Sequence, residues 1–356
     1  MKLLRLANTV NSTSAPYNQF SLGLKNTIDQ TFCSLFQHDI PIDKDIKGFH
    51  GDGSILRMLR IIKKLISQNN YDVVHIHSGL TGIIFMIAAF PFKLHLFNKV
   101  VFTLHNSWNV LKLRNQILNF FVMLTSKKIC TCGLSSRESL PGFITFFVGK
   151  KTEAIVNGFD HDRIDRVQNN KLDACHFEKS SKVKIVCVGA LNKTKNQIAL
   201  LKALKESNIE GEVIFLGDGV NKETLVDYSK NISNSISIIF KGRVSRDLAI
   251  EHMLEADVSV SLSNGEGLPI AVLESMYAGC FTILSSIPPH KEISPPAQRN
   301  LFVNTSDNSE IINSLNHVKD NIKQIRSGRI ESKEYSITYF SVNNMLRGYK
   351  RVYSSI

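Results

Sequence analysis

Residues 257–279 read DVSVSLSNGEGLPIAVLESMYAG, and this stretch decides the fold. Residues 257–262 form a short apolar run, residues 263–269 form a loop that contains glycines, and residues 270–279 repeat apolar side chains at helical spacing. A short continuous apolar run is typical of a strand buried on both faces of a parallel sheet. Pro269 suits the first turn of a helix, and Gly279 suits its end. The stretch therefore predicts one strand–loop–helix unit of a helix-covered parallel sheet.

The same alternation of β-branched runs and helical patterns continues on both sides of this stretch. Further predicted strands lie at residues 2–7, 72–76, 100–104, 128–131, 153–156, 183–189, 212–216, 236–240 and 281–285. A polar segment at 166–182 lacks such runs and is expected to be a linker. We therefore predict an α/β chain of two Rossmann-like, doubly wound domains at residues 1–165 and 183–336, followed by a terminal helix at 337–356.

Composition and charge limit the function classes. The 356 residues are 43% hydrophobic and 21% charged, as expected for packed domains, and the formal net charge is +12. Residues 1–170 hold 20 Lys/Arg against 11 Asp/Glu, so the basic half is expected to meet an anionic partner. No zinc-finger spacing, basic zipper or RNA-recognition motif occurs, so we do not expect nucleic acid. A phosphorylated ligand and an anionic membrane surface both remain open.

Two segments bear on location. The start of the chain lacks the apolar core of a signal peptide, and the apolar run at 80–92 is too short to span a bilayer and contains Pro91. Residues 110–128 combine an apolar side with lysines and arginine, so this helix could lie on anionic lipid, although a solvated helix packed on a sheet is favoured. We expect a cytoplasmic protein, peripheral at the inner face of the membrane.

Ligands of open parallel sheets bind beside the carboxyl ends of the strands, so the loops there are the first place to look. Gly265 and Gly267 let the backbone approach a ligand, and a helix N-terminus that follows glycines can receive a phosphate. Glu266 beside that anion site suits sugar hydroxyls, and Glu274, about two turns further, suits another polyol such as ribose. Lys195, in the loop after residues 183–189, could complete a diphosphate site as a point charge.

These motifs carry a resemblance to a known family. Residues 256–279, followed by Pro289–Ile293, resemble the signature of retaining glycosyltransferases of the GT-B fold, family four, whose paired glutamates fall on Glu266 and Glu274. The segments that resemble further landmarks of the family, in the expected order, are YDVVHIHS, VFTLHNS, VNGFD, VGAL with the following KN, LGDG and FKGRV. The GT-B fold implies two domains facing a central cleft, with the C-terminal helix returning to the first domain.

The resemblance implies transfer of a glycosyl unit from a nucleoside diphosphate sugar to an acceptor hydroxyl with retained anomeric configuration. It places Glu266 on the donor sugar, together with backbone N–H groups of Gly267 and Leu268. Glu274 would bind the nucleotide ribose, and Lys195 the diphosphate. The implied acceptor is a saccharide linked to a polyprenyl diphosphate in bacterial surface polysaccharide assembly, such as O-antigen or capsule.

Further positions follow from the same resemblance. Gly189 belongs to the phosphate loop, and Val244 lies where the base packs. His105 matches a histidine that approaches the transferred sugar when the cleft closes, although a buried core histidine is the alternative. His75 and His77 are interpreted as structural.

Departures from the family pattern stand at two loops. Ala190 replaces an arginine of the phosphate loop, for which Lys193 could substitute. The glycine-rich loop after the first strand is replaced by polar residues, among which Asn11 and Ser12 could meet the acceptor. Asp-x-Asp occurs at 43–45 and 160–162, away from the donor loops, and we predict no required metal and no cofactor besides the donor substrate.

Two other functions remain open from the sequence. A nucleotide-sugar 2-epimerase shares this two-domain fold and would convert the donor without a separate acceptor. A non-catalytic donor-binding protein is compatible with Ala190.

Overall fold

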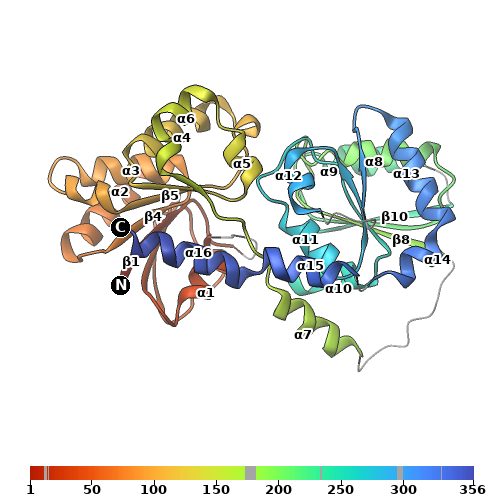
Figure 1. Ribbon diagram of the computed structural model, residues 1–356, viewed down its shortest axis with the longest axis horizontal. Coiled ribbons are helices and arrows are strands. Elements are labelled where there is room, and N and C mark those ends of the chain that lie inside the picture. Colours follow the sequence, from red (N-terminus) through yellow and green to blue (C-terminus); the bar gives the residue numbers. More distant parts are fainter. Residues whose placement is uncertain (12–13, 15, 173–181, 233–234, 295–299, 330) are drawn as a thin grey trace. The chain divides into compact units, whose positions relative to one another are not determined.

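A computed structural model describes residues 1–11, 14, 16–172, 182–232, 235–294, 300–329 and 331–356. The chain divides into two compact units (Figure 1): Met1–Gly158 with Val342–Ile356, and Phe159–Ser341. The first boundary thus falls a few residues before the predicted one at 165. Helix α7 (His161–Leu172) occupies the start of the segment predicted as a linker, because Asp160 Oδ1 accepts a hydrogen bond from the backbone N–H of Arg163 at 3.1 Å and caps the helix.

The first unit is built on a seven-stranded parallel sheet in the order β3-β2-β1-β4-β5-β6-β7. Its strands are β1 (Lys2–Ala7), β2 (Asp29–Ser34), β3 (Ile46–His50), β4 (Val73–Ile76), β5 (Val100–Leu104), β6 (Lys128–Thr131) and β7 (Thr152–Ala154). Its helices are α1 (Leu22–Leu24), α2 (Ile55–Gln68), α3 (Gly79–Ala89), α4 (Leu113–Thr125), α5 (Leu134–Glu138), α6 (Gly142–Val148) and α16 (Val342–Ser354), with short helical turns η1 (Pro16–Ser21), η2 (Leu94–Lys99), η3 (Trp108–Val110) and η4 (Gly149–Lys151).

Alternation along the strands assigns helices to the two faces of this sheet. Leu4 and Leu6 of β1 point into a core shared with α2, α3 and α4, whereas Leu3 points into a core shared with α1 and α16. Helix α16 presents Met345, Tyr349 and its neighbours to that second core, so the end of the chain completes the first unit (Figure 1). In the described parts of the chain, every helix falls short of the length and apolar character that a membrane span requires.

The second unit contains a six-stranded parallel sheet in the order β10-β9-β8-β11-β12-β13. Its strands are β8 (Val183–Val188), β9 (Gly211–Leu216), β10 (Ile236–Gly242), β11 (Val258–Ser261), β12 (Phe281–Ser285) and β13 (Asn300–Val303). Its helices are α7, α8 (Gln197–Glu206), α9 (Lys222–Ser229), α10 (Arg246–Glu255), α11 (Ile270–Tyr277), α12 (Pro288–Ile293), α13 (Asn308–Asp320), α14 (Ile322–Ser327) and α15 (Glu331–Phe340).

Strand order locates a switch point in each sheet. In the second unit the chain leaves β8 toward β9 and later returns to the other side of β8 as β11, so the order reverses between β8 and β11. In the first unit the reversal lies between β1 and β4. Crevices beside the carboxyl ends of strands at such points receive ligands in open α/β sheets. The loops that follow β8 and β11 carry Lys195 and Glu266.

Candidate active site

Hydrogen bonds tie the two loops at the switch point of the second unit to each other. The backbone N–H of Asn264 donates to the carbonyl of Thr194 at 2.7 Å, and Asn264 Nδ2 donates to the carbonyl of Lys193 at 2.9 Å. Because both bonds join the loop after β11 to the loop after β8, the two loops are held together at the carboxyl edge of the sheet.

This arrangement brings Lys195 and Glu266 together. Lys195 Nζ lies 2.6 Å from Glu266 Oε1, and the same oxygen accepts a hydrogen bond from Ser263 Oγ at 2.7 Å. The side chains of Lys195 and Glu266 are 28% and 11% exposed, so the pair is partly accessible to a ligand at the carboxyl edge of the sheet. The structure thus places side by side a cation suited to diphosphate and a carboxylate suited to sugar hydroxyls.

Gly189 makes room for the lysine. Its φ of 147° belongs to the region that favours glycine, and a Cβ there would lie 3.3 Å from Lys195 Cε. The lysine stem therefore crosses the backbone at the end of β8. Ala190, the departure from the family pattern, is exposed, as is Lys193.

Helix α11 begins directly after the Glu266 loop. Its N-cap is Pro269, whose side chain makes no capping hydrogen bond to the first turn. Gly267 and Leu268 are buried immediately before it. A helix start of this kind carries partial positive charge and favours an anion. Gly279, predicted to stop the helix, has a φ of 90°.

Glu274, on α11, has a partner that the sequence did not suggest. Arg246, in the first turn of α10, donates from Nε to Glu274 Oε1 at 3.0 Å, and its Nη2 contacts the same oxygen. Glu274 is 6% exposed, so the arginine supplies the charge that a buried carboxylate requires. Val244, expected near the base, is half-buried just before α10, two residues from Arg246.

The buried side chain of His290 supports the Glu266 loop through a series of hydrogen bonds. Burial lowers the pKa of His290 to about 4, so its imidazole is neutral at pH 7. Its Nδ1 lies 3.0 Å from the carbonyl oxygen of Ser285, which can only accept, so the ring proton sits on Nδ1. Ser285 Oγ in turn donates to the carbonyl of Ser263 at 2.6 Å, and Ser263 donates to Glu266. This chain of bonds fixes the carboxylate.

In the first unit, His105 ends a buried series of polar side chains. Arg5, fully buried, lies with its Nη1 2.9 Å from His77 Nε2 and 3.0 Å from His75 Nδ1. His77 Nδ1 lies 2.8 Å from His105 Nε2. His75 and His77 thus lie in the interior, and His77 contacts His105 directly.

The direction of these hydrogen bonds follows from the chemistry of arginine. Burial and the charge of Arg5 lower the pKa of His105 to about 4, and burial, His75 and Arg5 lower the pKa of His77 well below its ordinary value, so both rings are neutral at pH 7. Arginine only donates, so His77 Nε2 accepts and its proton sits on Nδ1. That proton is donated to His105 Nε2, which leaves the proton of His105 on Nδ1. His105 is therefore a hydrogen-bond donor at Nδ1.

The remaining predicted positions lie in the first unit. Asn11 is half-buried in the loop after β1, and its carbonyl accepts from Asn18 Nδ2 at 2.8 Å; Ser12 lies outside the described residues. Both Asp-x-Asp sequences have local roles, since Asp43 Oδ2 pairs with Lys25 at 2.7 Å and Asp160 caps α7. The described residues contain no group of three or more His, Cys, Asp or Glu placed to hold a metal ion.

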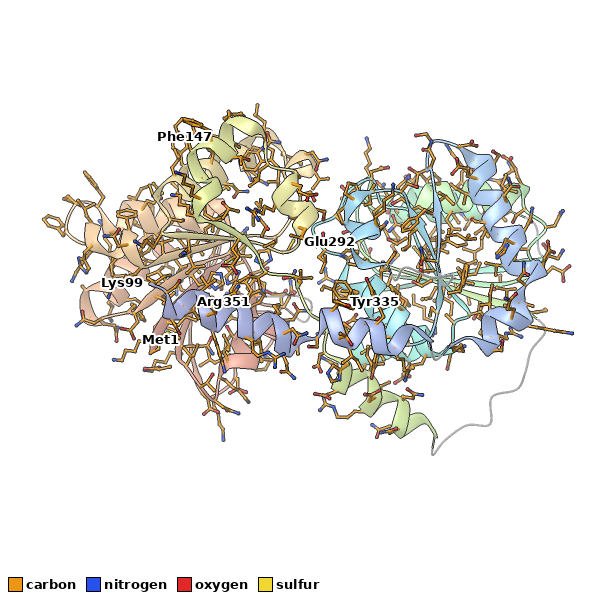
Figure 2. The ribbon with its side chains drawn as sticks, in the orientation of Figure 1. Met1, Lys99, Phe147, Glu292, Tyr335 and Arg351 are labelled. Atoms are coloured by element: carbon orange, nitrogen blue, oxygen red, sulfur yellow. The ribbon has the colours of Figure 1, made fainter. Side chains whose placement is uncertain are left out.

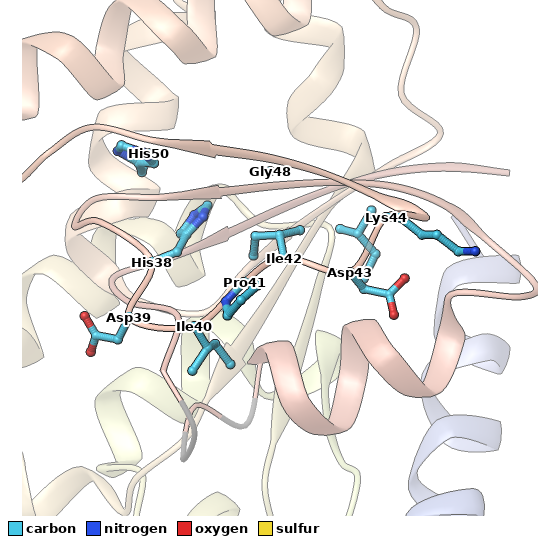
Figure 3. A pocket seen from close by; sticks show the side chains of 10 residues that line it. His38, Asp39, Ile40, Pro41, Ile42, Asp43, Lys44, Gly48 and His50 are labelled. Carbon is cyan, nitrogen blue, oxygen red and sulfur yellow. The ribbon is translucent and has the colours of Figure 1, made fainter.

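A pocket of about 620 Å³ lies on the edge strand of the first sheet (Figure 3). The segment after β2 forms one wall, where His38, Asp39 and Asp43 provide polar groups and Ile40, Pro41 and Ile42 provide apolar ones. Strand β3 forms the opposite wall. The pocket is next to the Asn11 loop, because the N–H of Asp39 donates to the carbonyl of Val10 at 2.8 Å. Sequence reasoning missed this pocket, because the Asp-x-Asp sequence at 43–45, whose first two residues line the pocket, was considered only as a metal site.

Two family models match the chain one after the other. Residues 36–163 match the model described as Glycosyltransferase Family 4, and residues 169–330 match the model described as Glycosyl transferases group 1. Between them they cover more than half of the chain. The chain is a family 4 glycosyltransferase.

Curated relatives of this glycosyltransferase are similar over most of their length. The capsular polysaccharide biosynthesis glycosyltransferase CapH of Staphylococcus aureus is 25% identical over 304 residues, which are 82% of this chain and 79% of CapH. The UDP-Gal:alpha-D-GlcNAc-diphosphoundecaprenol alpha-1,3-galactosyltransferase of Escherichia coli is 25% identical over 328 residues, which are 88% of this chain and 80% of that protein.

Solved structures confirm the GT-B fold. HepE of Anabaena, in complex with UDP and glucose, superposes with a TM-score of 0.78 at 14% identity and covers 100% of both chains. Sucrose-phosphate synthase of Thermosynechococcus elongatus superposes with a TM-score of 0.79 at 12% identity, over 100% of this chain and 99% of that one. The predicted fold class, two Rossmann-like domains of the GT-B type, is therefore confirmed.

Proposed function

We propose that this glycosyltransferase moves a hexose or N-acetylhexosamine from a nucleoside diphosphate sugar to a saccharide carried on a polyprenyl diphosphate, with retention of configuration. The product would enter a bacterial surface polysaccharide such as capsule or O-antigen. The observation that carries the proposal is the 2.6 Å contact between Lys195 Nζ and Glu266 Oε1 at the switch point of the second sheet. The UDP in HepE and the acceptor named for the Escherichia coli relative support the donor and acceptor classes.

The proposed donor site uses the two joined loops and the start of α11. Lys195 and the start of α11 would hold the diphosphate, where helix and ammonium add their positive charge. Glu266, together with backbone N–H groups of Gly267 and Leu268, would bind the donor sugar by hydrogen bonds to its hydroxyls. Glu274 would bind the ribose.

Two further residues complete the proposed donor site. Arg246 would hold Glu274 oriented toward the ribose, because it donates hydrogen bonds to that buried carboxylate and places a positive charge beside it. Val244 would pack on the base.

The proposed reaction is a front-side displacement. The bond between the anomeric carbon and the diphosphate oxygen breaks as the acceptor oxygen bonds to the same face of that carbon. The hydroxyl proton passes to the departing phosphate oxygen, so the leaving group acts as the base. Lys195 and the first turn of α11 would stabilise the negative charge that develops on the diphosphate. Because these groups supply the positive charge, we propose that transfer persists in excess EDTA.

The first unit would receive the acceptor. Asn11, in the loop after β1 at the switch point of its sheet, and Ser12, the next residue in the sequence, are the proposed acceptor contacts, and the pocket next to Val10 offers hydrogen-bonding and apolar walls for a saccharide. His105 would donate its Nδ1 proton to the transferred sugar. The proposed acceptor pocket is a feature that transfer requires and the 2-epimerase alternative does not. We further propose that the enzyme works as a peripheral protein at the cytoplasmic face of the membrane.

One incubation separates the three candidate functions. The chain is incubated with radiolabelled nucleotide sugars and a lipid-linked saccharide. A transferase labels the lipid, an epimerase releases an epimerised nucleotide sugar, and a binding protein returns the donor unchanged. Glu266→Ala is expected to abolish labelling, whereas Asp227→Ala, on the exposed surface of the same unit, is expected to retain it. Equal loss in both variants would contradict the site assignment, and the anomeric configuration of the product tests retention.

A further inference from the structure

Helices α4 and α6 of the first unit present apolar side chains to solvent. On α4 these are Leu113, Ile117, Phe121 and Leu124, spaced so that they form one stripe along the helix. On α6 they are Phe143, Phe146 and Phe147. Leu113 is 71% exposed and Phe146 is 85% exposed. We refer to these seven residues as the phenylalanine face; Figure 2 shows Phe147 at the outer edge of the unit.

The phenylalanine face is one continuous surface. The ring of Phe120 on α4 lies 6.0 Å from the ring of Phe143 and 6.3 Å from that of Phe147, so aromatic contacts join the two helices. Lys151, which follows α6, donates to the carbonyl of Leu124 at 2.7 Å and holds α6 to the end of α4. The two helices therefore present their exposed side chains as a fixed pair.

Core packing does not account for these side chains. Helix α6 already contributes Ile144 and Val148 to the core, and α4 contributes Val122 and Met123. The exposed residues lie on the remaining sides of each helix. Contiguous exposed apolar surface of this kind marks a site of association with another protein or a membrane.

The charge around the face decides between these partners. Residues 73–152, which include both helices, contain nine Lys/Arg and a single acidic residue, Glu138. Lys112 and Arg114 are exposed at the start of α4, Lys127 follows its end, and Lys150 follows α6. An apolar stripe flanked by lysines and arginines suits a bilayer that contains anionic phospholipid, because the apolar groups enter the acyl region while the cations meet the headgroups.

We propose that the phenylalanine face docks this protein on the surface of a bilayer containing anionic phospholipid, with α4 and α6 lying in the interface. The proposal deepens the peripheral location proposed above by naming the residues that make it. Its test needs no turnover, so its failure and the failure of the transferase assignment are distinguishable.

The experiment is sedimentation of the whole chain with vesicles of phosphatidylcholine, alone or with about a third phosphatidylglycerol. The chain is expected to bind the anionic vesicles at least about ten-fold more strongly than the neutral ones, and less strongly as salt is raised. The double variant Phe146→Ser/Phe147→Ser is expected to lose binding by about ten-fold or more at every salt concentration. Lys127→Glu/Lys150→Glu is expected to reduce binding chiefly at low salt.

Matched controls keep the result interpretable. Val220→Asp, at a 90% exposed position of the second unit, and Lys205→Glu, at an exposed position there, are expected to bind as the unchanged chain does. Every variant should melt at the unchanged temperature and bind UDP unchanged. Equal binding to both vesicle types, or retained binding by the phenylalanine variant, would overturn the proposal. It is also overturned if the lipid-free chain self-associates in sedimentation velocity and the phenylalanine variant does not.

Discussion

Replacing Glu266 by Gln is expected to tighten nucleotide binding and to abolish transfer. In the free protein, Glu266 Oε1 holds Lys195 Nζ at 2.6 Å, so a diphosphate has to compete with the carboxylate for the ammonium. A hydrogen bond between charged groups contributes about 1.5 kcal/mol or more to the stability of the contact. Because the side chains of Lys195 and Glu266 are only 28% and 11% exposed, solvent screens this interaction only in part. Since about 1.4 kcal/mol corresponds to a factor of ten, the dissociation constant of UDP should fall about ten-fold.

The assay is isothermal titration with UDP, set beside transfer measured on the same preparations. Lys195→Met should weaken UDP binding by about ten-fold, because the diphosphate loses a charge-assisted bond. Glu266→Gln should shift binding in the opposite direction, yet lose transfer because the donor sugar has lost its acceptor group. The reasoning is refuted if Glu266→Gln weakens UDP binding as much as Lys195→Met does.

Three more predictions concern single contacts. Arg246→Met leaves Glu274 buried without its partner and should lower the free energy of unfolding by about 3 kcal/mol. Adding Glu274→Leu should restore most of that loss, as measured by thermal melting. A double variant no more stable than Arg246→Met would contradict this pairing. The pKa of His290 is about 4 in the folded chain and about 6.5 in the unfolded chain, so its neutral form favours folding. The contribution of His290 to the free energy of unfolding should therefore be complete above pH 6.5 and fall by about 3 kcal/mol toward pH 4. His290→Gln should flatten this pH dependence in thermal melting, and an unchanged pH dependence in the variant would contradict the prediction. Nitrogen-15 NMR at pH 7 should show the proton of His105 on Nδ1, and His77→Phe should release that preference; a proton on Nε2 in the unchanged chain would show the hydrogen bonds to run the other way.

Strand prediction succeeded where burial on both faces leaves a continuous apolar run. The boundaries of β1, β5, β6 and β12 agree with the sequence prediction, because most residues that pack between helix layers are apolar or small; the buried Arg5 of β1 is an exception. Three strands were missed. Strand β2 (Asp29–Ser34) buries Gln30 and Thr31 within its run, and β3, at a sheet edge, exposes most of its side chains, so neither has the apolar signature. Strand β13 (NLFV) is four residues long, and its three apolar residues are too short a run to stand out.

The joined loops could be anticipated because both follow strands of one parallel sheet, whose carboxyl ends share an edge. Lys195 and Glu266 are 71 residues apart, and the topology alone brings them to one place. The roles of Arg246 and His290 could not be assigned in the same way. Neither the ion pair of Arg246 with Glu274 nor the hydrogen bonds of His290 beneath the Glu266 loop produce a pattern in the neighbouring sequence. Arg246 begins the helix after β10, so its position at the carboxyl edge of the second sheet could be predicted from the strand–loop–helix pattern, although its partner could not.

A crystal structure of the chain with UDP will show whether the joined loops of the second unit hold the diphosphate. We expect a diphosphate oxygen within about 3 Å of Lys195 Nζ, the ribose against Glu274, and the contact between Lys195 and Glu266 opened by the ligand. A nucleotide bound elsewhere on the chain, with the lysine still held by the carboxylate, would contradict it.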